Sequence, residues 1–179
     1  MIDSAEMMIT PPSILKAKNN QTVKIYSYHL NISNDEIIDT IYSNISNRER
    51  ETPAKADLTG WHLPGCKELK QIVEDLTYKQ AVEHYHRGFG QLKITQCWGI
   101  VYNRDDFAKT HNHFPNTWSA VYYPKLTDDS GTLCFTDLDV RIKPEVGKLL
   151  IWESYIKHCV TKVRGERLAI AFNMNHEHE

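Results

Sequence analysis

The 179-residue chain has the length of one ordinary domain, with 41% hydrophobic and 25% charged residues, the composition of a soluble globular protein. A formal net charge of -2 gives no general attraction to nucleic acid or to anionic membranes, so neither partner is expected. No apolar run approaches the roughly 20 residues of a membrane-spanning helix, and the N-terminus lacks the order of a signal peptide. The four cysteines show no CxxC spacing, which favours free thiols in a reducing, cytoplasmic setting.

The first half of the chain carries mainly helical patterns. A short strand is expected at 22–29, and apolar side chains then recur at helical spacing over 35–46. Asn34, or the serine before it, can cap the start of this helix. After a polar loop, a second helix is predicted to begin near Gly65 and to end at 88–90.

After residue 90 the helical period gives way to short runs rich in β-forming residues and separated by turn residues. Seven or eight short strands in about 85 residues indicate a sandwich or barrel with jelly-roll or cupin topology. The strands are predicted at 92–103, 107–113, 118–123, 132–137, 140–142, 148–153, 158–163 and 167–173.

The fold class expected is therefore mainly β with N-terminal helices, a double-stranded β-helix (jelly roll, cupin-like). We interpret 1–179 as a single domain. Within it, 1–90 form a helical support region, 91–175 form the jelly-roll core, and 176–179 form a polar tail.

Three histidines and one arginine stand out in the second half. His111 and His113 project from the same face of an extended segment, because side chains alternate along a strand. His158 leads into another strand-like run, and three convergent imidazoles suit a divalent transition metal. Arg167 adds a fixed cation that a metal alone does not require, so the set predicts a metal together with an anionic co-substrate.

The run from Arg167 to Asn173 alternates strictly. One face is apolar, and the other carries Arg167, Ala169, Ala171 and Asn173. The small alanines leave room beside the arginine, as a cavity for a small molecule would need.

Three stretches of the second half read HNHFPNTWSAVYYPK, SGTLCFTD and PEVGKLLIWESYIKHCVTKVRGERLAIAFN. They resemble the iron(II)- and 2-oxoglutarate-dependent dioxygenases, in particular the prolyl-hydroxylase-like branch with its small microbial and phage members. The resemblance covers roughly 92–174 and includes the spacing of nine residues from His158 to Arg167. The first 90 residues carry no comparable motif; in the family that region supplies helical support and substrate-facing loops.

The resemblance implies a role for each matching residue. His111 and His158 match the first and the distal metal histidines, and Arg167 matches the residue that pairs with the far carboxylate of 2-oxoglutarate. A guanidinium fork suits that planar anion. The other co-substrate-binding residues implied are Tyr123, Tyr102 and Asn173.

His113 departs from the family, which usually has an aspartate or glutamate at this position. Either His113 ligates and the site is a three-histidine facial triad, or it points elsewhere and water or another group completes the shell. A neutral imidazole in place of a carboxylate leaves the metal with one more unit of positive charge, which favours binding of an anion. The acids expected as outer-shell partners are Asp105, Asp106 and Asp137.

The resemblance implies an oxygenase that uses Fe(II), 2-oxoglutarate and O2 to hydroxylate a protein or peptide side chain or a small molecule, releasing succinate and CO2. The implied location is cytoplasmic, or the host cytoplasm for a phage protein, and assembly as a homodimer stays open. Two alternatives remain: a cupin-type isomerase or ligand-binding protein without 2-oxoglutarate, and a jelly roll without catalysis. The substrate is not specified by the sequence. Four tryptophans are candidates to line a pocket or to lie in the core, namely Trp61, Trp98, Trp118 and Trp152.

Overall fold

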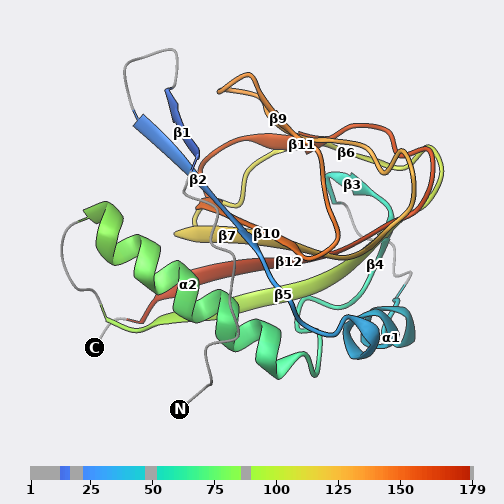
Figure 1. Ribbon diagram of the computed structural model, residues 1–179, viewed down its shortest axis with the longest axis horizontal. Coiled ribbons are helices and arrows are strands. Elements are labelled where there is room, and N and C mark those ends of the chain that lie inside the picture. The colour runs from blue at the N-terminus through green and yellow to red at the C-terminus, as the bar shows by residue number, and fades with distance from the viewer. Residues whose placement is uncertain (1–12, 17–21, 47–51, 86–89, 178–179) are drawn as a thin grey trace.

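The computed structural model describes residues 13–16, 22–46, 52–85 and 90–177. Two β-sheets face each other, and two helices lie on the outer side of the larger sheet (Figure 1). In chain order the elements are β1 (Ser13–Lys16), β2 (Thr22–His29), α1 (Asp35–Ser43), β3 (Ala54–Lys55), β4 (Asp57–Leu58), α2 (Lys67–Tyr85), β5 (Leu92–Tyr102), β6 (Phe107–His111), β7 (Trp118–Leu126), β8 (Leu133–Phe135), β9 (Val140–Ile142), β10 (Lys148–Glu153), β11 (His158–Val160) and β12 (Arg167–His176).

The two sheets have the arrangement of a double-stranded β-helix, which confirms the predicted fold class. The larger sheet has the order β1-β2-β10-β7-β12-β5-β4, and the smaller has the order β3-β6-β11-β8-β9. Neighbouring strands in both sheets run antiparallel. One hydrophobic cluster fills the space between the sheets, and a second lies between the larger sheet and the helices. The larger sheet is thus buried on both faces.

Strand β12 follows its sequence pattern closely. Leu168, Ile170 and Phe172 are fully buried in the cluster beneath the helices. Ala169 and Ala171 belong instead to the cluster between the sheets. The alternation of the sequence therefore points Arg167 and the alanines into the interior of the β-helix, as expected.

Helix α1 occupies part of the predicted range, ending at Ser43 instead of 46. Asn34 stands at the N-cap position, but its side chain makes no cap hydrogen bond. Instead, its Oδ1 accepts a hydrogen bond of 2.7 Å from the hydroxyl of Tyr122, which ties the helix start to β7. Helix α2 begins at Lys67, two residues after Gly65. Its predicted end at 88–90 falls mostly outside the described residues.

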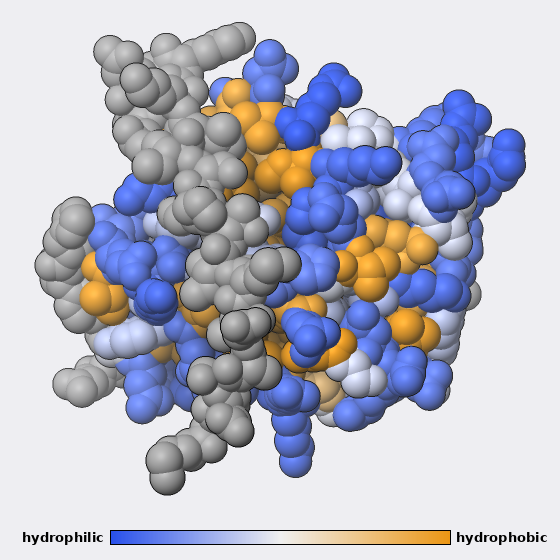
Figure 2. Space-filling view, in the orientation of Figure 1, coloured by the Kyte–Doolittle hydropathy of each residue, from blue (hydrophilic) through white to orange (hydrophobic). Residues whose placement is uncertain are grey.

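The first 90 residues contribute strands as well as helical support. β2 pairs with β10, and β4 pairs with β5, so both extend the larger sheet. β3 pairs with β6 at the edge of the smaller sheet. No helix among the described residues is long and apolar enough to cross a bilayer. Hydrophilic side chains cover much of the face seen in Figure 2, as expected when the apolar sides of both sheets are buried.

Candidate metal centre and its cavity

The three histidines predicted from the sequence meet at one end of the smaller sheet. His111 ends β6 and lies directly opposite His158, the first residue of β11. His113 follows two residues after β6, and its backbone N–H donates to the carbonyl of Ser154. One ring nitrogen from each histidine lies within 4.8 Å of the others. In the described part of the chain, this is the only group of three or more His, Cys, Asp or Glu residues placed to hold a metal.

An irregularity in β6 helps to aim these side chains. His158 pairs with His111, whereas Val160 pairs with Ala108, so β6 contains one residue more than β11 over this interval. Such a bulge bends a strand locally and redirects its side chains. The predicted strand 107–113 therefore ends at His111, and the chain leaves the ladder before it reaches His113.

Hydrogen bonds fix the rings of two histidines. The Nδ1 atom of His111 lies 2.7 Å from the carbonyl oxygen of Lys109, and Nδ1 of His158 lies 3.1 Å from that of Ile156. A carbonyl can only accept, so each Nδ1 carries the hydrogen and each Nε2 keeps its lone pair for a metal. Backbone carbonyls thus take the outer-shell role at these two rings.

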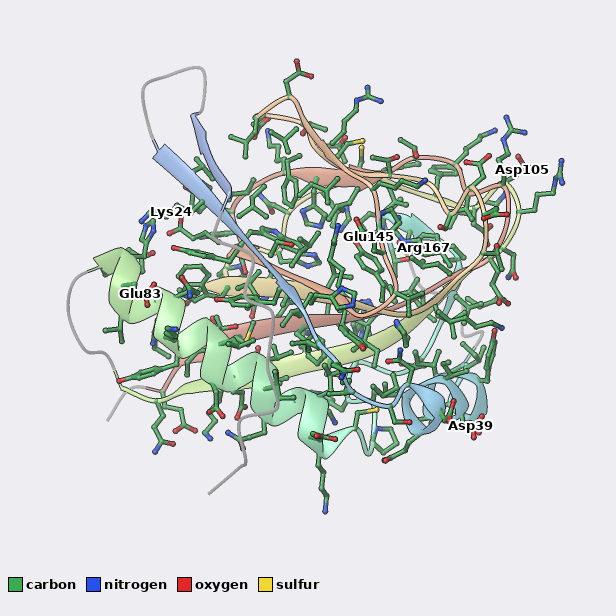
Figure 3. The ribbon with its side chains drawn as sticks, viewed as in Figure 1. Lys24, Asp39, Glu83, Asp105, Glu145 and Arg167 are labelled. Atoms are coloured by element: carbon green, nitrogen blue, oxygen red, sulfur yellow. The ribbon has the colours of Figure 1, made fainter. Side chains whose placement is uncertain are left out.

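The prediction of Asp105, Asp106 and Asp137 as outer-shell partners is wrong for these two rings. Asp106 instead accepts a hydrogen bond from the backbone N–H of Asn103. Asp105 lies at the outer edge of the molecule (Figure 3) and is exposed, as is Asp137.

The environment keeps the three imidazoles neutral. Burial lowers the pKa of His111, and burial together with His111 lowers the pKa of His113 to about 3. Burial and the two neighbouring histidines hold the pKa of His158 well below its usual value. Neutral imidazole is the form that binds a metal, so the donor set fits a divalent transition ion without prior loss of protons.

Arg167 is a buried cation without a carboxylate partner. Its side chain is 1% exposed and lies in the interior of the β-helix (Figure 3). Nη2 donates to the hydroxyl of Tyr123 at 3.1 Å, and Nη1 lies 3.5 Å from the carbonyl of Ser130. The Nε atom has no hydrogen-bond partner, and no carboxylate among the described residues lies within ion-pair distance. A buried positive charge without a carboxylate partner lowers the stability of the folded protein unless an anion binds beside it.

Two tyrosines flank the guanidinium. Its central carbon lies 5.4 Å from the ring centre of Tyr102 and 4.8 Å from that of Tyr123. Burial raises the pKa of Tyr102 to about 12 and also raises the pKa of Tyr123, so both hydroxyls keep their hydrogen at neutral pH. Tyr102 lines the cavity described next, whereas Tyr123 supports Arg167 without lining it.

One cavity of about 290 Å³ contains both the histidines and Arg167. No aspartate, glutamate or lysine lines it, so Arg167 is its one permanently charged side chain among the described residues. Ala169 and Ala171 form part of the wall, which is the room inferred from the sequence. The residues of the earlier predictions that line it are His111, His113, His158, Arg167, Tyr102 and Asn173.

Asn173 is tied to protein groups at both ends of its amide. Its Oδ1 accepts from the hydroxyl of Ser119 at 3.1 Å, and its Nδ2 donates to Oε1 of Gln96 at 2.8 Å. Ser119 in turn shares a 2.7 Å hydrogen bond with Ser154. Gln96, which also lines the cavity, was not predicted; its position opposite Asn173 on β5 would have suggested it only once the register was known.

Aromatic side chains form much of the wall near the histidines. Trp98 contacts the ring of His113 at 5.7 Å between centroids and that of Trp61 at 4.9 Å. Trp152 lies 5.0 Å from the ring of His158. Phe114, beside His113, is 75% exposed and also lines the cavity. Three of the four tryptophans thus line the cavity, and the fourth, Trp118, lies in the core.

Comparison with known proteins gives a match at the level of structure. No protein-family model and no curated protein sequence matches the chain. Among solved structures, it is similar to a viral collagen prolyl hydroxylase of Paramecium Bursaria Chlorella virus-1 in complex with 2OG, with 14% identity and a TM-score of 0.64 over 86% of this chain and 96% of that one. A prolyl-4-hydroxylase of Pseudomonas putida has 17% identity and a TM-score of 0.65 over 86% and 93% of the two chains.

A third similar structure is a prolyl hydroxylase of Trichoplax adhaerens in complex with a peptide fragment of hypoxia inducible factor. It has 17% identity and a TM-score of 0.59, over 84% of this chain and 83% of that one. The chain therefore has the fold of the 2OG-Fe(II) oxygenases, in the form found in prolyl hydroxylases. The resemblance noted from the sequence is confirmed at the level of the fold.

Proposed function

We propose that the protein is an iron(II)- and 2-oxoglutarate-dependent oxygenase. One observation carries the proposal: a buried arginine without a carboxylate partner shares a single cavity with three neutral, convergent histidines. The buried arginine favours binding of an anion, and the three histidines favour binding of a metal. A dicarboxylate that also binds the metal satisfies both at once.

The roles of the protein groups follow from their surroundings. His111, His113 and His158 would hold the iron, two of them through the Nε2 atoms that their carbonyl contacts leave free. Arg167 would bind the far carboxylate of 2-oxoglutarate. The Tyr123 hydroxyl accepts a hydrogen bond from Arg167 and so would hold the guanidinium in place for that carboxylate. With both groups bound, the site supplies the oxidising chemistry that hydroxylates a C–H bond and releases succinate and CO2.

The charge of the site supports this choice of co-substrate. The three histidines are neutral, so they offset none of the charge of a divalent ion. Arg167, which is 1% exposed, adds a further positive charge. A dianion such as 2-oxoglutarate compensates much of this charge.

The substrate is proposed only as a class. Similar structures include one that contains a peptide. We therefore propose a peptide side chain or a small molecule as the group that is hydroxylated. Because no described acidic or lysine side chain lines the cavity, the reacting end of that substrate should be uncharged.

The test is an anaerobic titration of the full-length protein with iron(II) and then 2-oxoglutarate. A weak visible charge-transfer band of the chelate is expected. Arg167→Met should weaken 2-oxoglutarate binding by about 10- to 100-fold, the value of charge-assisted hydrogen bonds, and leave iron binding unchanged. The control is Arg164→Met, since Arg164 is exposed and does not line the cavity.

Two outcomes would contradict the proposal in different ways. Bound iron without the band would favour a cupin-type protein that does not use 2-oxoglutarate, for which three histidines also suffice. Loss of iron binding in Arg167→Met, with folding intact by circular dichroism, would show that the roles of the residues are assigned wrongly.

A further inference from the structure

Two cysteines face each other on the outer side of the smaller sheet. Cys134 on β8 and Cys159 on β11 are direct register partners. Their neighbours His158 and Val160 line the cavity, and Phe135 lies in the core between the sheets. Because side chains alternate along a strand, both thiols must point away from the cavity, toward the opposite face.

This outer face is not covered by either helix. α1 and α2 make their contacts with β5 and β7 of the larger sheet. Cys159 is partly exposed, whereas Cys134 is 7% exposed. A small oxidant can therefore reach Cys159 first, with Cys134 next to it. The thiols are close enough for Cys159 to contribute to the raised pKa of Cys134, after the larger effect of burial.

The ladder defines the spacing of the pair. Thr161 donates its backbone N–H to Thr132 at 3.0 Å, and Thr136 donates to Lys157 at 3.1 Å. These pairs lie two residues to either side of the cysteines, so Cys134 and Cys159 also occupy a hydrogen-bonded position. Cα atoms are then about 5.5 Å apart, within the range of disulfides.

The Cβ atoms at such a position are less favourably spaced. Directly opposite residues have Cβ atoms about 4.5–5.5 Å apart, with hydrogen-bonded pairs toward the longer end. A disulfide needs about 3.5–4.5 Å. The two strands would have to approach slightly, which strains the bond. Strained and exposed disulfides are the readily reduced ones.

We propose that Cys134 and Cys159 are a redox modification site that forms a reversible disulfide when the protein meets a peroxide. In the first step the Cys159 sulfur attacks one peroxide oxygen, the O–O bond breaks, and a sulfenic acid and water form. In the second step the Cys134 sulfur attacks that sulfur, the S–O bond breaks, and a second water leaves. Two thiols are oxidised by two electrons and one peroxide is reduced to two waters.

The modification should affect the metal centre, and this part rests on the proposed function. Cys159 follows His158 directly, and Phe135, next to Cys134, lies 6.1 Å from the His158 ring between centroids. Closing the strands displaces the backbone that orients His158. An outer-shell disturbance of this kind lowers metal affinity by about 10-fold or more.

Peptide mapping tests the modification independently of metal and activity. The full-length protein is treated with one equivalent of hydrogen peroxide, alkylated and digested with trypsin under non-reducing conditions. A cross-linked species joining peptides 126–141 and 158–162 is expected, and dithiothreitol should abolish it. Iron(II) affinity is measured on undigested, non-alkylated portions of the same treated protein after the peroxide has been removed, and should fall about 10-fold, then recover on reduction.

Matched variants locate the site. Cys134→Ser and Cys159→Ser should each remove the cross-link and protect iron binding from peroxide, whereas Cys97→Ala, at a buried cysteine of β5, should behave as the wild type. Over-oxidation of Cys159 without the cross-link, or a cross-link elsewhere, would overturn the proposal. A cross-link that leaves iron affinity unchanged would overturn only its link to the metal centre.

Discussion

His113 determines the charge of the candidate metal centre. With a histidine at this position, all three protein ligands are neutral, since burial keeps the pKa of each imidazole below its usual value. An aspartate or glutamate here would remove one unit of positive charge from the site. The choice of residue at 113 therefore controls how strongly the centre attracts an anion, apart from any effect on geometry.

Substitutions of His113 separate its role as a metal ligand from its effect on the charge of the site. His113→Ala removes a ligand and should lower iron(II) affinity at least about 10-fold. His113→Asp keeps a ligand but adds negative charge, so it should retain iron and bind 2-oxoglutarate more weakly than the wild type. Anaerobic titrations measure both. His29→Ala, at an exposed histidine of β2, is the control and should change neither value. Unchanged iron affinity in His113→Ala would exclude His113 as a ligand.

The histidines and Arg167 could be predicted because their chemistry is unusual for a strand and their spacing matches a known pattern. The partners that orient them could not. Lys109 and Ile156 contribute only backbone carbonyls, which no residue type encodes. Gln96 reaches the cavity through the register of β5 against β12, and register is a tertiary property.

Helix α1 packs on β5 at a glycine. A Cβ atom at Gly99 would lie 2.9 Å and 3.0 Å from side-chain carbons of Ile41, and 3.0 Å from Thr59. Ile41 is fully buried, so it has little freedom to move aside. The absence of a side chain at this single strand position lets the helix approach the sheet.

Gly99→Ala should therefore destabilise the protein by about 1–3 kcal/mol, the usual cost of overpacking. Urea denaturation followed by circular dichroism measures this value. The double variant Gly99→Ala with Ile41→Ala removes both contacting carbons, Cγ1 and Cγ2, so it should be less destabilised than the sum of the two single variants. Gly60→Ala is the control, because nothing lies within 4 Å of a Cβ there. Equal effects at both glycines would contradict this account.

The type and order of β2, the two helices and the strands from β5 onward followed from periodicity, and β9 and β10 have the predicted bounds. The short strands β1, β3 and β4 were not predicted. The ends of other strands did not follow, because hydrogen bonds from distant parts of the chain decide them. The predicted strand at 158–163 ends at Val160. Beyond it, Val163 exchanges backbone hydrogen bonds with the loop at Asp105 and Asp106 instead of continuing the ladder.

At the scale of the whole molecule, the buried histidines connect folding to pH. Their pKa values are lowered in the folded protein, whereas an unfolded chain returns them to about 6.5. As the pH falls below about 6.5, the unfolded state binds protons that the folded state does not. Stability present above this pH is therefore lost progressively toward the pKa of about 3 of His113.

The metal-free protein should lose up to about 1.4 kcal/mol per pH unit for each of His113 and His158 between roughly pH 6.5 and 5, with a further contribution from His111. Urea denaturation at several pH values gives this slope. His113→Phe should reduce the slope by the contribution of one proton. A stability independent of pH in this interval would show that the imidazoles are not kept neutral by burial.

The position of the histidines also means that a bound metal would link two strands of the smaller sheet to each other. His111 and His158 belong to adjacent strands and face each other across one ladder. An ion shared by them would act as a cross-strand staple, so β6 and β11 could not separate without losing it. Local separation of these two strands and release of the ion would then be a single event. The frequency of that event would determine the lifetime of the bound metal.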